Sequence, residues 1–539
     1  MPAVAKLMRM KGPNGKLPCR ACNIRGVRAR TGPNPNTNYV PLSRPFDEDP
    51  NGPQRYQPLD LPLRTHAEYI DQAMDVEEAV NDADEDRWSR ETGINGLLPL
   101  ARIPSLSFPV SFPHDFMHLI FENIIPTLFD LWTRSQVWTA IAEACPLVGN
   151  SIPYVFGCRV PDPKKKRAEL TAESRLLLAT LLAPVLLYGR FVHPHYYRHF
   201  IRLVRLINLC IDFEIMHDNI NEIRVGFAEW VTLTTKVREV LLFQRSYPVA
   251  MGPVWAYWAF PMERFCGALT RASMSRRHPY SSINRRVLQI TQLSQIKLIY
   301  GLTEELDLEE CKENIKNGTR YDHYPDLVFV NPTKEIDLQP SLQRKVAKHV
   351  SSMIGIEEWV ISNALEGRRS RVWGKMQRLG SSLAEQAVGG DVVRGAMLTS
   401  CESMRDVSHV RFYSKFSRWH WDRVRPTELH DERLSYGRAE MFVVLEANFI
   451  ASLNVPDPRP IVVAIVSPFV RLRYIHDADL VEYRLSSGNY AGAEVVDATK
   501  IDCLVGRITT GTLCQRFFVV ERTSVVGRMD MLDITVEPD

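Results

Sequence analysis

The spacing of apolar residues changes once along this chain of 539 residues, and the change limits the fold more than any other feature. Between residues 114 and 300, apolar side chains recur at helical intervals. The stretch FMHLIFENIIPTLFDLW, for example, puts Phe116, Ile120 and Ile124 on one face of a helix. After residue 436, short runs of β-branched and aromatic residues are separated by Pro, Asp and Gly, which is typical of strands. The sequence therefore predicts an α+β fold, in which a helical region precedes a small β domain.

These changes in texture predict four segments. Residues 1–60 are rich in Gly, Pro, Asn and Arg and should consist mostly of loops. Residues 61–300 form the helical region, in which TAES at residues 171–174 predicts the start of a helix. Residues 301–430 are mixed and predict a linker-like region with helices, of which SLQRKVAKHVSSMIGIEEWVISNAL is the clearest. Residues 431–539 make up the C-terminal β domain.

Composition excludes some classes of protein. Hydrophobic residues make up 45% and charged residues 24% of the chain, which is the range of ordinary globular proteins and argues against extensive disorder. The sequence contains no apolar run long enough for a membrane helix, so we expect no membrane partner. The ten cysteines lack the spacing of a disulfide framework and predict reduced thiols. A net charge of +3 is too small to identify a partner.

A pair of cysteines near the start of the chain predicts a metal site. In LPCRACNIRG, two residues separate Cys19 from Cys22, the spacing with which one turn offers two sulfur ligands to zinc. The loop is polar, and a buried apolar thiol is not expected there. The alternative is a chance coincidence among ten cysteines. The pair supplies half of a tetrahedral site, so two further ligands must come from elsewhere.

The motif HDFMH is a candidate for the missing ligands. Asp115 and His118 are three residues apart, so on a helix they lie on the same face and can reach one ion. Asp is the weaker candidate of the two because structural zinc sites use mainly Cys and His. In the alternative interpretation, Asp115 caps the helix and His118 is a satisfied polar residue beside it.

A single carboxylate stands within an unusually aromatic stretch. Glu263 lies in MGPVWAYWAFPMERFCGAL, directly before Arg264. A carboxylate in such apolar surroundings should be paired, hydrogen-bonded or bound to a metal. The alternative is a structural pair between Glu263 and Arg264.

Two basic clusters are candidates for binding and targeting. The stretch LTRASMSRRHPYSSINRR mixes arginines with a histidine and a tyrosine, a combination that suits phosphates and exposed bases but also occurs on plain solvated faces. The cluster Lys164, Lys165, Lys166 and Arg167 suits either a nuclear-import signal or a phosphate contact. The arginines that we take as candidates for DNA binding are Arg264, Arg271, Arg276, Arg277, Arg285 and Arg286.

Several of these stretches, in this order, resemble the CACTA-type (CMC superfamily) DNA transposases found in basidiomycete fungi. The matching stretches include MPAVAKLMRMKG, PCRACNIRGVR, SFPHDFMHLIFENIIPTLFDLW, GPVWAYWAFPMERFCGAL and NRRVLQITQLSQIKLIYG, and together the matches cover most of the chain. The resemblance implies a nuclear protein with an RNase H-like core that holds two Mg²⁺ or Mn²⁺ ions and cleaves and joins DNA strands. It also implies a large helical insertion and a C-terminal β module.

The resemblance assigns roles to individual residues. Cys19 and Cys22 match the Cys-x-x-Cys of the family's zinc site, and Asp115 with His118 match its Asp-x-x-His. Glu263 matches the third catalytic acid. In this scheme residues 1–60 hold the zinc knuckle and the end of the RNase H-like core.

The chain departs from the family at its start. In the family the other two catalytic aspartates fall before the stretch that corresponds to MPAVAKLMRMKG, so we expect a chain truncated at its N-terminus and inactive alone. The alternative is a non-catalytic, zinc-containing factor, derived from a transposon, that binds DNA or protein. Both interpretations allow a homo-oligomer.

Overall fold

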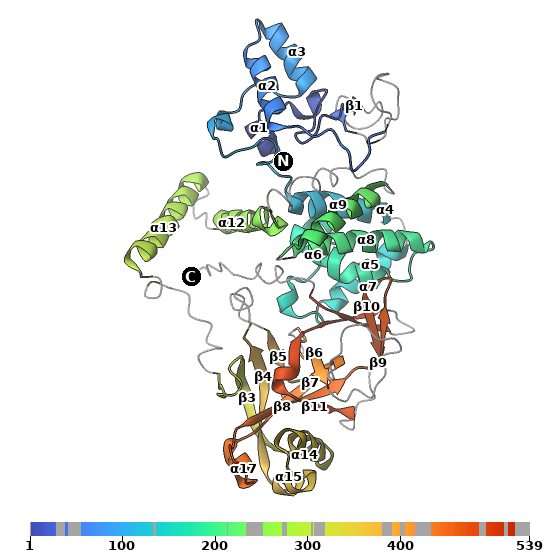
Figure 1. Cartoon of the computed structure of the whole chain (residues 1–539), viewed down its shortest axis with the longest axis vertical. Coiled ribbons are helices and arrows are strands. Elements are labelled where there is room, and N and C mark those ends of the chain that lie inside the picture. Colours follow the sequence, from blue (N-terminus) through green and yellow to red (C-terminus); the bar gives the residue numbers. More distant parts are fainter. Residues whose placement is uncertain are drawn as a thin grey trace. The chain divides into compact units, whose positions relative to one another are not determined.

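The computed structural model describes residues 2–28, 38–40, 42, 55–132, 136–212, 214–232, 252–271, 277–302, 306, 318–379, 391–398, 405–414, 433–484, 492–510 and 516–522. It divides into two compact units, which are treated separately below. Unit 1 comprises Met1–Leu131 and His199–Phe260, and unit 2 comprises Trp132–Arg198 and Pro261–Asp539. The predicted α+β class is confirmed by the helices and antiparallel sheets of these units (Figure 1).

Unit 1 is mainly helical. Its only described strand pair is the short antiparallel pair β1 and β2. A π-helical turn, η3, runs directly into the helix α4. The elements are α1 (Pro2–Leu7), η1 (Gly12–Asn14), β1 (Val27–Arg28), β2 (Asn38–Tyr39), α2 (His66–Glu77), α3 (Asp82–Thr92), η2 (Pro99–Arg102), η3 (Met117–Ile124), α4 (Ile125–Trp132), α9 (His217–Thr232) and η7 (Val254–Ala256).

Local sequence signals explain where α2 and α3 begin and end. Thr65 and Glu68 form a reciprocal capping box at the start of α2. The side chain of Asn81 accepts the amide of Asp84 at the start of α3. The helix ends at Gly93, whose φ of 76° favours glycine, and a Cβ there would lie 2.1 Å from the carbonyl oxygen of Leu17. This close approach positions the segment that leads into the cysteine loop.

The core of unit 1 confirms the predicted apolar face. Phe116, Ile120 and Ile124 are all buried. A separate cluster joins the N-terminal segment to α2, and in it the hydroxyl of Tyr69 donates to the carbonyl oxygen of Met8. Burial raises the pKa of Tyr69 to about 12, so the hydroxyl remains a donor over the ordinary pH range.

Unit 2 contains a helical part and a β part. As predicted from TAES, Thr171 caps α6, because its side chain accepts the amide of Ser174. The helix α8 begins in unit 2 and continues into unit 1. The helical elements are α5 (Gln136–Val148), η4 (Tyr154–Phe156), η5 (Arg167–Glu169), α6 (Ala172–Leu177), η6 (Leu178–Leu182), α7 (Ala183–Leu187), α8 (Pro194–Ile211), α12 (Phe260–Arg271), α13 (Pro279–Tyr300), α14 (Pro340–Ile354), α15 (Glu358–Leu365), α17 (Ala447–Ser452) and η9 (Ala498–Lys500).

The strands of unit 2 form an eight-stranded and a four-stranded sheet. In the larger sheet the order is β11-β8-β7-β4-β3, with β5 beside β4, β6 beside β7 and β12 beside β6. In the smaller sheet the order is β13-β14-β10-β9. The strands are β3 (Leu327–Asp337), β4 (Arg369–Arg378), β5 (Val392–Arg394), β6 (His409–Ser414), β7 (Arg433–Leu445), β8 (Ile461–Pro468), β9 (Val470–Ile475), β10 (Leu480–Arg484), β11 (Glu494–Asp497), β12 (Ile501–Leu504), β13 (Gly506–Thr510) and β14 (Arg516–Val520).

The boundary of the β part differs from the prediction. Residues 301–430, which we expected to be linker-like, contain the expected helices α14 and α15 but also supply β3 to β6. These strands belong to the same sheet as the later ones, since β4 and β6 both pair with β7. Local composition does not reveal which distant strands pair with each other. The sequence pattern therefore placed the start of the β part at residue 431, whereas β3 already begins at Leu327.

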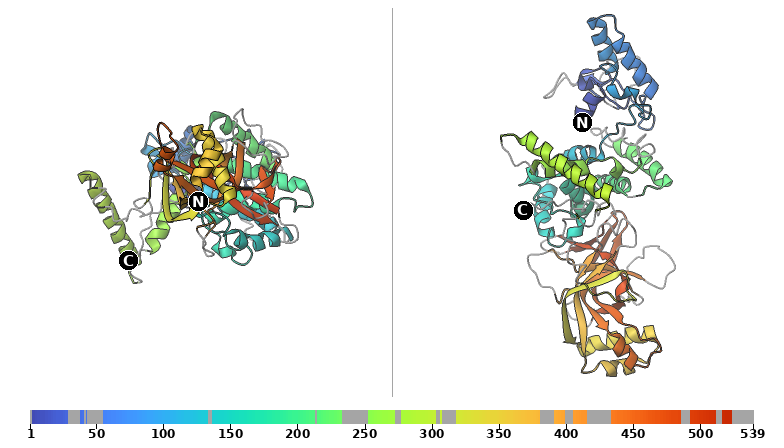
Figure 2. Two further views of the ribbon diagram at one scale, coloured as in Figure 1. Left: turned by 90° about the horizontal axis from the view of Figure 1, so that it is seen from below. Right: turned by 90° about the vertical axis from the view of Figure 1, so that its left-hand side faces the viewer.

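The helices α14, α15 and α17 pack together beside the larger sheet (Figures 1 and 2). Val346 of α14 and Ile361 of α15 are completely buried in one cluster with Val372, Val443 and Val463 of the strands. The apolar faces of these helices are therefore buried against the sheet, as the packing of helices on a sheet requires.

Every strand pair in the described residues of unit 2 is antiparallel. The RNase H-like core, whose end we expected in residues 1–60, stays a prediction. No helix within the ranges given above has both the length and the apolar character that crossing a membrane requires.

Candidate functional site

The cysteine loop of unit 1 brings the two predicted sulfur ligands together. Cys22 is buried and Cys19 is half-buried. The amide of Ala21 donates to the sulfur of Cys19 at 3.3 Å. A hydrogen bond from the Cys22 thiol, with help from backbone amides, lowers the pKa of Cys19 to about 7, and the same bond raises the pKa of Cys22. Cys19 is therefore easily ionised, as a metal-binding or reactive thiol must be.

A buried arginine holds this loop in place. The Arg64 side chain is 4% exposed, and its Nε donates to the carbonyl oxygen of Cys19 at 3.0 Å. Its Nη2 donates to the carbonyl oxygens of Leu17 and Thr92 at 3.1 and 2.7 Å. Burial lowers the pKa of Arg64, and the negative charge of ionised Cys19 and Cys22 opposes that effect. The arginine therefore stabilises the thiolate form of the pair.

The second predicted ligand pair is also brought together. The Asp115 Oδ2 lies 2.5 Å from His118 Nδ1 and accepts the backbone amide of His118 at 2.9 Å. The Oδ1 of Asp115 accepts the amide of Ala259 at 2.6 Å. Asp115 thus binds a backbone amide in the first turn, as the structural alternative predicted. A carboxylate on one nitrogen of a histidine also orients that ring for metal binding, which favours His118 over Asp115 as a ligand.

The cysteine loop contacts the start of the HDFMH segment. Nη2 of Arg20, the residue after Cys19, donates to the carbonyl oxygen of Pro113 at 2.9 Å. His114 follows Pro113, and desolvation, reinforced by the charge of Arg20, lowers its pKa to about 3. His114 is therefore neutral, the form that binds metals. The sequence pattern did not single out His114, although this residue opens the HDFMH motif.

The two pairs do not make a closed metal site. Within the ranges that the structure describes, no three Cys, His, Asp or Glu side chains form a group that could hold a metal. The chemistry of Cys19 and Cys22 fits half of a zinc site, because the two sulfurs are adjacent and the Cys19 sulfur is stabilised as thiolate. His118 fits as a third donor by its orientation toward Asp115.

The exposure of Glu263 differs from the prediction. The sequence predicted a carboxylate buried among aromatic residues, but Glu263 is exposed in the first turn of α12. The aromatic residues before it, Trp258 and Phe260, are buried in contact with each other in unit 1. A helix points successive side chains in different directions, so an aromatic sequence window does not enclose each of its members. Arg264 is half-buried.

The arginine-rich stretch leads into α13. Arg277 and Arg285 are exposed, and Arg286 is half-buried. Tyr280 is 81% exposed. The helix contains no Asp or Glu from Pro279 to Tyr300. Arg276 and the side chain of Arg271 lie outside the described residues.

The basic loop at Lys164 to Arg167 is exposed. The Asp162 Oδ1 accepts the amides of Lys164 and Lys165 at 2.8 and 3.1 Å, which fixes the turn. Lys166 forms an ion pair with Glu169 at 2.9 Å. The cluster is therefore accessible to a partner, as either an import signal or a phosphate contact requires.

Comparisons of the chain with protein-family models, with curated proteins and with solved structures found no match.

Proposed function

We propose that this chain is a DNA-binding protein of transposase ancestry, which contacts DNA through the arginines before and within α13 and carries a structural zinc ion. The main support for DNA binding is the positive charge of α13. The helix has Arg285, Arg286 and Lys297 but no carboxylate along its 22 residues. Nothing in the helix itself offsets this charge, so it attracts the phosphates of a nucleic acid.

The exposed side chains near the start of α13 suit DNA chemically. Arg277 and Arg285 can each bind a phosphate through two N–H groups. Tyr280 offers an exposed ring for stacking on a base. The positive end of the helix dipole adds to the attraction at the same end.

Zinc would have a structural role in this proposal. Cys19 and Cys22 would supply sulfur ligands and His118 a nitrogen ligand, with Asp115 orienting the histidine. A structural zinc would contribute directly to the stability of the loop that carries its ligands. The exposed basic loop at Lys164 to Arg167 would direct the protein to the nucleus.

The ancestral reaction would be two-metal cleavage and joining of DNA strands, with Mg²⁺ or Mn²⁺. We do not extend that reaction to this chain. Of the three catalytic acids that the resemblance implies, Glu263 is the one that matches a position here, and it is exposed.

Salt-dependent binding to a fluorescently labelled DNA duplex tests the proposal. Each phosphate contact that is lost should reduce the slope of log affinity against log salt by about one. We therefore expect the double variant Arg277→Ala/Arg285→Ala to bind more weakly, with a slope reduced by about two. The matched control is Arg368→Ala/Arg369→Ala, which removes two adjacent exposed arginines at the start of β4 and should change neither quantity.

Two outcomes would contradict the proposal. The first is an unaltered chain that shows no salt-dependent affinity for duplex DNA. The second is an equal slope for the Arg277→Ala/Arg285→Ala variant and the control variant, which would make these arginines part of an ordinary solvated surface.

A further inference from the structure

The helices α12 and α13 expose an unusual amount of apolar surface. Although the described residues are mostly well packed, no residue of α13 is buried. Leu298 is 79% exposed and Ile299 is 72% exposed. Of the 26 exposed large hydrophobic side chains in the described ranges, ten lie in these two helices: Met262, Phe265, Tyr280, Leu288, Ile290, Leu293, Ile296, Leu298, Ile299 and Tyr300.

The sequence of α13 indicates that this surface is covered in solution. From Val287 to Tyr300 the helix has one charged residue, Lys297. Its apolar side chains point in several directions, since Leu288 and Leu293 are five residues apart and lie on different sides of a helix. A helix that is apolar on several sides is normally buried. Exposed patches of this kind in a protein mark interaction sites.

We propose that α13 packs in antiparallel orientation against α13 of a second copy of this chain, with α12 of each copy beside the pair. A helix that is apolar on more than one side needs more than one neighbour. Two helices from each copy provide a four-helix arrangement around a shared apolar core. A two-fold axis makes the same surface complementary to itself, which is the commonest way in which identical chains associate.

The charges of α13 favour this partner and this orientation. An antiparallel pair centred on Leu293 places Arg286 of one copy opposite Tyr300 of the other. Arg286 then lies beside the negative end of the partner helix and near an aromatic ring, and both interactions are attractive. In a parallel pair, Arg285 and Arg286 would instead lie beside their own copies and repel each other. The low charge of the remaining surface removes most other repulsion between identical helices.

This inference goes beyond the proposed function and is tested without DNA. Sedimentation or light scattering of the full chain should show a dimer. The variant Leu298→Glu/Ile299→Glu places charges on two of the most exposed apolar positions, so we expect dimerisation to weaken by about 100-fold or more. The matched control is Val80→Glu, since Val80 is 92% exposed and lies in unit 1 between α2 and α3. The control should remain a dimer.

Cross-linking tests the orientation. In a background in which the exposed Cys158 and Cys266, together with Cys311, Cys401 and Cys514, are replaced by Ser, Leu293→Cys places a new thiol at the proposed centre. A short bismaleimide should then join two copies. Ser281→Cys should not be joined, because an antiparallel pair separates the two copies of this position by about 36 Å. A monomer at every concentration, a dimer unaffected by Leu298→Glu/Ile299→Glu, or equally efficient cross-linking at position 281 would overturn the proposal.

Discussion

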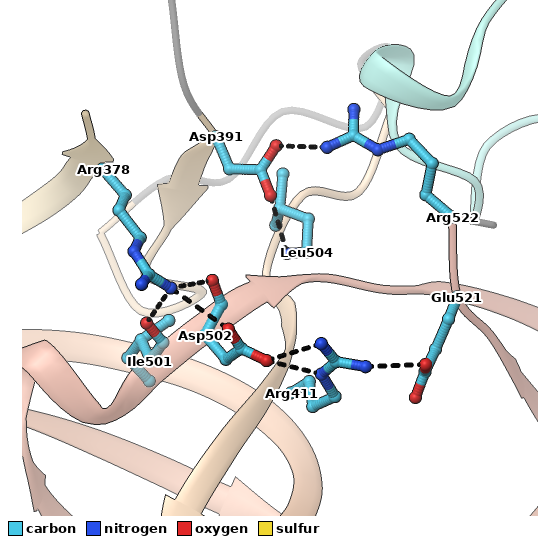
Figure 3. A network of polar contacts seen from close by, with 8 residues as sticks. All are labelled: Arg378, Asp391, Arg411, Ile501, Asp502, Leu504, Glu521 and Arg522. Carbon is cyan, nitrogen blue, oxygen red and sulfur yellow. Dashed lines mark hydrogen bonds and ion pairs between the residues drawn. The ribbon is translucent and has the colours of Figure 1, made fainter. Parts of the chain in front are cut away.

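The carboxylate of Asp391 forms an ion pair with Arg522 at 3.1 Å, and both side chains are almost completely buried, with 7% and 11% exposure (Figure 3). The other carboxylate oxygen accepts the amide of Leu504 at 3.1 Å. Arg522 also donates to the carbonyl oxygen of Val155 at 3.0 Å. The pair therefore joins the end of the smaller sheet to the larger sheet and to the helical part of unit 2.

We expect Asp391→Ala to be strongly destabilising. The substitution would leave the guanidinium of Arg522 buried without its counter-ion and would remove the acceptor of the Leu504 amide. Breaking one side of a buried pair typically costs about 3–5 kcal/mol, which a urea unfolding curve would show as a lower midpoint. As a control, Asp337→Ala removes a pair with Arg369 whose side chains are 71% and 68% exposed, and it should cost about 0.5 kcal/mol or less. Equal shifts for the two variants would contradict this account.

The local structure of the chain could be predicted from its sequence, because the signals lie within a few residues of each other. Thr171 at the start of α6 and the short runs that became β7 and β8 are examples. A helix cap and a strand each depend on neighbouring residues, which a linear pattern records. The adjacent pairs at Cys19 with Cys22 and at Asp115 with His118 could be found for the same reason.

The long-range contacts could not be predicted. Asp391 and Arg522 are 131 positions apart, and nothing in either neighbourhood indicates the partner. The same holds for Arg64, which lies 45 positions from the cysteine whose carbonyl it binds. The error at Glu263 has a related cause, because composition does not reveal the direction of a side chain on its helix.

The burial of the His409 ring predicts that the protein loses stability in weak acid. The ring is 1% exposed, and burial, with contributions from Arg507 and Arg438, lowers its pKa to about 4 from 6.5 despite the nearby carboxylate of Asp406. The folded state therefore favours the neutral ring, whereas the unfolded chain takes up the proton first. The contribution of His409 to the free energy of unfolding is therefore fully present above pH 6.5. It should fall by about 3 kcal/mol as the pH decreases toward 4.

Unfolding midpoints between pH 7 and pH 4.5 would check this dependence. His409→Gln should make the dependence on pH shallower, whatever its effect at pH 7. His193→Gln changes an exposed histidine and should leave the dependence unaltered. The prediction is wrong if His409→Gln has the same pH profile as the unaltered protein.

Zinc analysis tests the cysteine loop. The purified chain should contain about one zinc ion, and Cys19→Ser or Cys22→Ser should remove most of it. His118→Ala should also reduce the zinc content. Asp115→Asn should retain most of the metal, since both carboxylate oxygens of Asp115 bind groups of the protein.

The matched control for the zinc measurement is Cys145→Ala. Burial raises the pKa of Cys145 to about 12, so this thiol stays protonated and is a poor metal ligand. Its removal should leave the zinc content unchanged. A zinc content that is insensitive to both Cys19→Ser and Cys22→Ser would exclude the metal site.

The last prediction concerns Glu263, on which a catalytic role would depend. Two-metal cleavage requires several carboxylates around a pair of divalent ions. Glu263 is exposed on α12, and no group of metal-binding side chains surrounds it among the residues that the structure describes. We therefore expect the chain to bind supercoiled plasmid DNA without nicking it in Mg²⁺ or Mn²⁺. Glu263→Gln should bind with the same affinity and salt dependence, because the change removes one exposed charge outside α13. Metal-dependent nicking that Glu263→Gln abolishes would instead establish the chain as an active nuclease.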